Sequence, residues 1–283
     1  MLRSKRTRPV LLALLLATTA ACNDDFNQGW RIDRTRVLGA KAIVDGDISR
    51  ASPAPGEAFH VDWFVVSPSG SVPTTWRLTA CRRADSGRGS QCDGPSLAEV
   101  SGTGNVPTVS LTAPPAGALG DATHLLVWGD IDKTNVDNAV MLQTVKSGSN
   151  RNPHIDAADL LLDGQPWTTE DGLCEGALPR IVADDAKHEV ALVVRESNRE
   201  TIDGGRETMQ LSHFTTAGRL DRLYSVLDGT DPAVDKALSV SWEAKPDTAP
   251  PAGGMVVHFY FGLRDSRGGM DFATRALCMR PRG

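Results

Sequence analysis

The feature that most constrains the fold of this chain is a period of two in its apolar residues. Segments 58–66 ("AFHVDWFVV") and 237–244 ("ALSVSWEA") alternate between the two faces of an extended strand. Turn-forming residues, drawn from 27 Gly and 17 Pro, separate such runs about every 8–12 residues. The pattern predicts an all-β protein built of antiparallel sandwiches, with Trp63, Trp128 and Trp242 in the cores.

The distribution of these runs predicts two Ig-like β-sandwich domains in tandem, at 36–147 and 155–283. A polar stretch at 146–156, "KSGSNRNPHID", marks the predicted boundary between them. One short helix is expected near 135–145, because an asparagine that can cap it precedes apolar residues at helical spacing. The cap would be Asn135, followed by Val136, Ala139, Val140 and Gln143.

The first 21 residues have the three parts of a secretory signal: basic residues, an apolar run and small residues. The order Thr19-Ala20-Ala21-Cys22 resembles the bacterial lipobox, although Thr19 stands where an aliphatic residue is usual. We predict a lipoprotein signal peptide at 1–21, lipid attachment at Cys22 and an N-terminal tether at 22–35. Ordinary cleavage after Ala20 or Ala21 is the alternative.

Lipidation would place the protein in the cell envelope, with the membrane as its first partner. Two or three acyl chains give stable anchoring without a spanning helix. Removal of residues 1–21 takes away four positive charges and no acids, so the formal net charge changes from −5 to −9. That charge argues against nucleic acid as a partner. Asn23, rather than Asp, follows Cys22, which favours the outer membrane over the inner.

The four other cysteines are predicted to form disulfides, because export brings them into an oxidising compartment. Four cysteines allow three connectivities. Cys81–Cys92 and Cys174–Cys278 are favoured, since the first pair would close a hairpin and the second would tie the C-terminal half to its last strand.

Motifs for catalysis or metal binding are weak. The acidic segment with Asp130, Asp132 and Asp137 lacks the Gly and Glu of an EF-hand, so another kind of calcium site stays open beside helix capping. The six histidines show no metal-binding spacing, and no nucleophile motif stands in a suitable context. We therefore assign no catalytic residue, no metal ligand and no cofactor. "RGG" at 267–269 predicts a hairpin in which both glycines take positive φ.

In the order of its features the chain resembles the Ig-like surface lipoproteins of delta-proteobacterial, myxobacterium-like genomes. The matching pieces are the lipobox, "RVLGAKA", "SPAPGEAFHVDWFVVSPSG", "NRNPHI", "HFTTAGRL" and "LRDSRGGMDFATRALC". That family is largely uncharacterised, so the resemblance implies an anchored Ig-like architecture and supplies no catalytic residue.

These observations favour a lipid-anchored, non-catalytic envelope protein that binds a protein or a polysaccharide through loops at 82–91, 146–156 and 197–206. Two alternatives stay open. One is an envelope hydrolase or metal-dependent enzyme whose site is assembled from distant residues. The other is a structural member of a multi-lipoprotein assembly.

The substitution Cys22→Ala should move the protein from the membrane fraction to the soluble periplasmic fraction, because the site of acylation is lost. Fractionation of cells followed by immunoblotting measures this directly. Unchanged retention in the membrane fraction would contradict the predicted lipid anchor.

Overall fold

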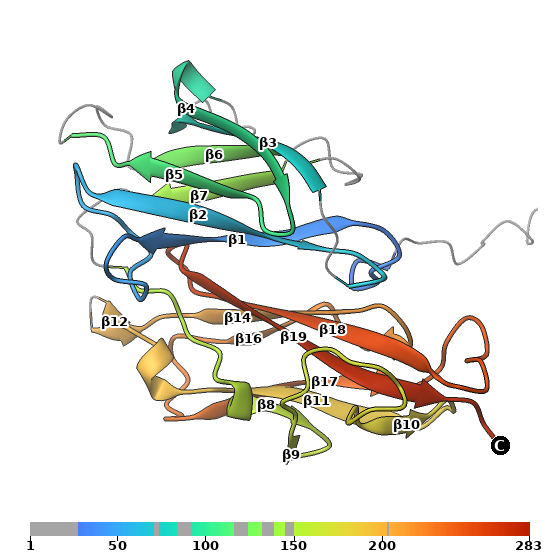
Figure 1. The fold of residues 1–283 in the computed structure, drawn as a ribbon. Helices are drawn as coiled ribbons and strands as arrows, with labels where there is room; N and C mark the ends of the chain where they lie inside the picture. Colours follow the sequence, from blue (N-terminus) through green and yellow to red (C-terminus); the bar gives the residue numbers. More distant parts are fainter. Residues whose placement is uncertain are drawn as a thin grey trace, which may run out of the picture.

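The computed structural model describes residues 28–70, 74–83, 92–115, 124–131, 139–144, 150–202 and 204–283. Throughout these residues the secondary structure is strands and turns, with short 3-10 helices at η1 (Ala157–Asp159) and η2 (Glu196–Asn198). The predicted fold class is confirmed: two antiparallel Ig-like β-sandwiches follow each other along the chain (Figure 1). One local exception is the parallel pairing of β10 with β19.

The first sandwich is formed by a three-stranded and a four-stranded sheet. The inward residues of β2 are the core that the alternation predicts: Phe59, Val61, Trp63 and Val65 are at most 5% exposed. The three-stranded sheet has the order β1 (Arg36–Val44), β2 (Ala58–Val66), β5 (Thr108–Thr112), and the other has the order β4 (Cys92–Gly104), β3 (Thr74–Arg83), β6 (His124–Ile131), β7 (Ala139–Thr144).

The second sandwich is formed by two five-stranded sheets around a separate core. Trp242 is fully buried there, and its indole Nε1 donates to the Ala217 carbonyl at 3.0 Å. One sheet has the order β10 (Arg180–Val182), β19 (Met270–Arg280), β18 (Met255–Arg264), β14 (Met209–Thr215), β16 (Tyr224–Leu227). The other has the order β15 (Arg219–Leu220), β17 (Lys236–Glu243), β11 (Lys187–Val194), β8 (Leu160–Leu162), β9 (Gln165–Pro166), and β12 (Thr201–Ile202) pairs with β13 (Gly205–Arg206).

The helix expected near 135–145 is wrong over residues 139–144, which form strand β7 beside β6. A short apolar run is compatible with the period of a helix and with that of a strand, and here pairing with β6 selects the strand. Register with β6 satisfies the backbone polar groups of the segment, with Val140 opposite Trp128. The proposed cap, Asn135, lies outside the described residues, as does the side chain of Trp128.

The two sandwiches pack face to face through the outer faces of β1 and β2 and of β14, β18 and β19 (Figure 1). We call the buried residues at this contact the inter-sandwich cluster; they are Ile32, Val66, Phe214 and Tyr260. Each such side chain stabilises the packed state by about 1.5–3 kcal/mol when fully buried. Phe64 of β2 also stacks on Phe272 of β19, with 4.4 Å between ring centroids.

Polar contacts fix the position of one sandwich on the other. Lys41 Nζ of β1 lies 2.9 Å from Asp271 Oδ1 of β19 in a largely buried ion pair. The Tyr260 hydroxyl donates to the carbonyl of Ser67 at 3.0 Å. A hydrogen bond at a buried site has strict geometry and leaves a costly unpaired group when broken. The contact therefore specifies one orientation rather than a loose association.

The segment predicted as the domain boundary takes part in this junction. Asn152 Nδ2 donates to the Ala42 carbonyl at 2.7 Å, and Asn152 Oδ1 accepts from the Met270 N–H at 3.0 Å. One side chain therefore links the two sandwiches through backbone groups of both.

Part of the predicted tether also belongs to the folded unit. Ile32 N–H donates to the Thr215 carbonyl, and Thr215 N–H donates to the Trp30 carbonyl, at 2.9 and 3.0 Å. Trp30 packs into the second core, while Ile32 joins the inter-sandwich cluster. The N-terminal segment thus enters between the two sandwiches, rather than serving over its whole length as a tether.

The hairpin between β18 and β19 confirms the turn predicted for "RGG". Gly268 has a φ of +101°, as expected, but positive φ is not found at Gly269. Gly269 is required for space instead, because a Cβ there would lie 2.6 Å from the backbone carbonyl oxygen of Arg151.

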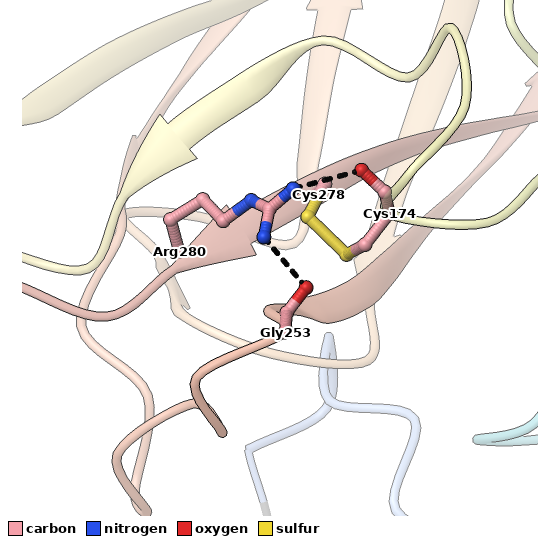
Figure 2. Close-up of a disulfide and its surroundings, with 4 residues drawn as sticks. All are labelled: Cys174, Gly253, Cys278 and Arg280. Carbon is pink, nitrogen blue, oxygen red and sulfur yellow. Dashed lines mark hydrogen bonds between the residues drawn. A yellow bond between two sulfur atoms is a disulfide. The ribbon is translucent and has the colours of Figure 1, made fainter.

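The predicted disulfide between Cys174 and Cys278 is present and buried (Figure 2). Arg280 closes one side of it by donating to the Cys174 carbonyl at 3.0 Å and to the Gly253 carbonyl at 2.8 Å. A Cβ at Gly254 would lie within 2.9 Å of both sulfurs, so only glycine fits there without rearrangement. The bond joins the loop before β10 to the last strand, 104 residues apart.

Cys81 of β3 is also in a disulfide. The β3–β4 pairing places the Cys92 backbone opposite Arg83. The side chain of Cys92 lies outside the described part of the chain, so the predicted Cys81–Cys92 pairing stays a prediction.

Replacing both Cys174 and Cys278 by alanine should lower the free energy of unfolding by about 2–5 kcal/mol, because the unfolded chain loses a long closed loop. Urea denaturation monitored by tryptophan fluorescence measures the change. Either single alanine variant should lose a similar amount, since both remove the same bond. A loss near zero would contradict a stabilising role for this disulfide.

Candidate functional site

A cavity of about 290 Å³ lies where the two sandwiches meet. Its walls come from β2 and nearby turns of the first sandwich, and from β18, β19 and the segment at 170–171 of the second. We call it the inter-sandwich pocket. The first sandwich contributes Trp63, Phe64, Val65, Val66, Gly70, Asn105 and Val106 to its lining, and the second contributes Glu170, Asp171, His258, Tyr260, Phe272 and Thr274.

The strand sequences explain why an apolar pocket forms here. The outward face of β2 is polar at His60 and Asp62 and apolar at Phe64 and Val66. Only the apolar half is covered by the second sandwich. Strand β18 is buried on both faces over most of its length, as expected for a strand with one sheet on each side.

Aromatic rings form the inner wall. The Phe64 and Phe272 rings are parallel within 5°, and the Tyr260 ring meets Phe64 edge to face at 6.0 Å. Burial raises the pKa of the Tyr260 hydroxyl, so this group stays protonated and donates to the Ser67 carbonyl. The wall is therefore rigid and uncharged.

Two carboxylates stand at the mouth. The side chains of Glu170 and Asp171 are 72% and 83% exposed. The Gly172 N–H and then the His258 imidazole lower the pKa of Asp171, so it is charged at neutral pH. Glu170 lies 3.6 Å from the guanidinium of the buried Arg275. Within the described lining there is no lysine or arginine, so the mouth has an acidic character.

His258 connects the acidic mouth to the aromatic wall. Its Nε2 lies 3.3 Å from Asp171 Oδ1, and its ring stacks on Tyr260 with 6.2 Å between centroids. The residue is 8% exposed, and its Nδ1 is buried without a hydrogen-bond partner. If Nε2 carries the proton toward Asp171, Nδ1 is an acceptor. Nδ1 is itself fully buried, so it is not open to a molecule in the pocket.

The residues predicted from the sequence do not converge on this pocket. Cys174 and Cys278 form their disulfide between the loop before β10 and strand β19, and Cys81 lies in β3. Asp130 is in β6 opposite Arg77, whereas Cys22, Asp132 and Asp137 lie outside the described residues. The calcium hypothesis for this acidic segment therefore stays untested.

Across the described ranges no three His, Cys, Asp or Glu side chains are grouped closely enough to hold a metal ion. His60 lies 2.9 Å from Asp45, and His188 lies 2.7 Å from Asp163. Both are exposed pairs between a strand and a neighbouring turn. The polar loop predicted at 197–206 contains the β12–β13 hairpin and is tied down by the buried Arg199.

Sequence reasoning missed the pocket because it treated each sandwich alone. The available signal was the apolar outward pair Phe64 and Val66, together with the doubly apolar run of β18. Such patterns indicate a sheet covered on both faces. They do not indicate which element covers it.

The sequence matches no family model and no curated protein. Among solved structures it is similar to the red sea bream transglutaminase, at 10% identity and a TM-score of 0.27 over 89% of this chain and 32% of that one. The chain is 11% identical to the Yersinia pseudotuberculosis adhesin InvE, with a TM-score of 0.22 over 84% of this chain and 58% of the adhesin. It is 11% identical to the elastase-activated Escherichia coli alpha-2-macroglobulin, with a TM-score of 0.25 over 90% of this chain and 22% of the macroglobulin. The chain thus spans less than two thirds of each, and similarity this distant extends to no activity or partner.

His213 gives the second core a dependence on pH. Burial lowers the pKa of its imidazole to about 4, while Nε2 lies 3.1 Å from the Ser225 hydroxyl. In the unfolded chain the imidazole titrates near 6.5. Between these values the unfolded state binds more protons, so stability falls as the pH is lowered.

We expect the unfolding free energy of the wild type to lose about 3 kcal/mol through His213 between pH 6.5 and pH 4. The His213→Gln variant should lack this contribution, as measured by urea denaturation across that range. The same change at the exposed His154 serves as the control. Parallel pH profiles for the wild type and His213→Gln would contradict the prediction.

Proposed function

We propose that this protein is a lipid-anchored, non-catalytic component of the cell envelope that binds a partner in the inter-sandwich pocket. The observation that carries the proposal is the pocket itself. It is built by both sandwiches, and it combines an aromatic wall with the carboxylates of Glu170 and Asp171 at its mouth. Concave sites between domains that combine apolar walls with a few polar groups are the usual places for ligands.

Two features support the envelope location. The N-terminal segment resembles a lipoprotein signal that ends at Ala21, directly before Cys22. Disulfides persist mainly in oxidising compartments, and both Cys81 and the Cys174–Cys278 pair are oxidised. Among the described residues, no helix has the length and apolar character needed to cross a membrane.

A lipid at Cys22 would also hold the pocket near the membrane. Trp30 is packed into the second sandwich and stands eight residues after Cys22. Eight residues span at most about 29 Å when fully extended. The partner would therefore be a molecule of the envelope surface within reach of that short connection.

Binding is favoured over catalysis by how the pocket residues are held. The His258 imidazole is stacked on Tyr260 and lies beside Asp171, while the Tyr260 hydroxyl is committed to Ser67. A His–Asp pair is the arrangement that a hydrolase would use. A hydrolase would also need a nucleophile positioned by that imidazole, and the lining hydroxyl of Thr274 has no hydrogen bond to His258 among the described contacts.

Photocrosslinking in cells tests this function. Val106, at the rim, and Val234, away from the pocket, are 55% and 57% exposed, which makes them matched positions for p-benzoyl-phenylalanine. Irradiation should give an adduct of defined mass from position 106 and not from position 234. Equal labelling at both positions, or no adduct at 106, would contradict a partner at this pocket.

A further inference from the structure

We propose that the inter-sandwich pocket receives a guanidinium-bearing side chain, that of an arginine on a partner protein. This inference rests on the proposed binding function and names the chemistry of the bound group.

Two carboxylates, those of Glu170 and Asp171, stand at the mouth, and the described lining holds no lysine or arginine. The amide of Asn105 and the hydroxyl of Thr274 also line the cavity, and each of them can accept a hydrogen bond. The Tyr260 hydroxyl is already directed to the Ser67 carbonyl. The carboxylates therefore favour a ligand that brings a positive charge and several donors. Guanidinium has five N–H donors, no acceptor and a permanent charge.

The wall suits the flat face and the apolar stem of such a side chain. Phe64, Phe272 and Tyr260 supply ring surface beside the carboxylates. Cations, and guanidinium in particular, are attracted to aromatic faces within about 6 Å. The same junction already uses this contact within the chain, since the Arg36 guanidinium lies 5.7 Å from the centre of the Phe214 ring.

The size of the cavity favours a single side chain. Its volume of about 290 Å³ stands at the lower end of the roughly 300–1,000 Å³ typical of small-molecule sites. Because the two sandwiches are fixed by the Lys41–Asp271 pair and by Tyr260, the pocket is formed before the ligand arrives.

The test compares N-acetyl-L-arginine amide with N-acetyl-L-citrulline amide, in which a neutral urea replaces guanidinium at nearly the same shape. Chemical-shift titration of the whole mature protein should show the arginine probe binding at least about tenfold more tightly than the citrulline probe, because charged hydrogen bonds and the cation–ring contact are lost. Raising the salt concentration should weaken the arginine complex.

Substitutions of residues that line the pocket test whether the arginine probe binds there. Asp171→Asn and Phe272→Leu should each weaken binding of the arginine probe about three- to tenfold. Glu175→Gln removes an exposed carboxylate outside the pocket and should leave the affinity unchanged. Thermal unfolding of each variant confirms that it is folded before its affinity is compared.

Equal affinity for the two probes, or no binding of either, would overturn the inference. So would tighter binding of chitotriose, tested as the saccharide probe. If crosslinks still form at Val106 in those cases, the proposed binding function stands and only the chemistry of the ligand is wrong. If neither probe binds and no crosslink forms, both proposals fail.

Discussion

The packing of β2 against β18 and β19 is the contact on which the rest of the structure depends. Strands β2 and β18 each have one face in their own sandwich core and the other in the inter-sandwich cluster. Strand β19 contacts β1 and places Phe272 on Phe64. Val66 and Tyr260 would otherwise expose large apolar surfaces to water, which is unfavourable in proportion to their area. The Lys41–Asp271 pair then selects one orientation. The pocket lies beside this contact and shares Phe64, Val66 and Tyr260 with it.

The N-terminal and C-terminal segments both strengthen the second sandwich. Trp30 and Ile32 are held beside Thr215 by backbone hydrogen bonds, and Cys278 ties the last strand to the loop at Cys174. A lipid at Cys22 would therefore pull on a segment that is already part of a core. In the proposed function, this arrangement would keep the pocket close to the membrane, because the anchored segment is packed directly into the second sandwich.

Much of the fold could be predicted because half-buried strands have apolar residues at every second position. The alternation in β2 and β17 and the hairpin before β19 required only the sequence. The prediction failed at 139–144, where an apolar run too short to show its period became strand β7 through pairing with β6. The pocket was also missed, because Glu170, His258 and Phe64 are far apart in the chain. No local pattern links them.

By itself, the sequence determined the all-β class and the two-sandwich architecture, since these depend on local periodicity, and it favoured the Cys174–Cys278 disulfide among three possible connectivities. Only the tertiary structure decided that the sandwiches stack through their outer faces, and that His258 retains a buried atom without a donor. The physical reason is that period and turn chemistry act within a strand or hairpin. The packing of one sheet face on another depends on shape complementarity between surfaces that are distant in the sequence. The same complementarity sets the space that is left between the two sandwiches.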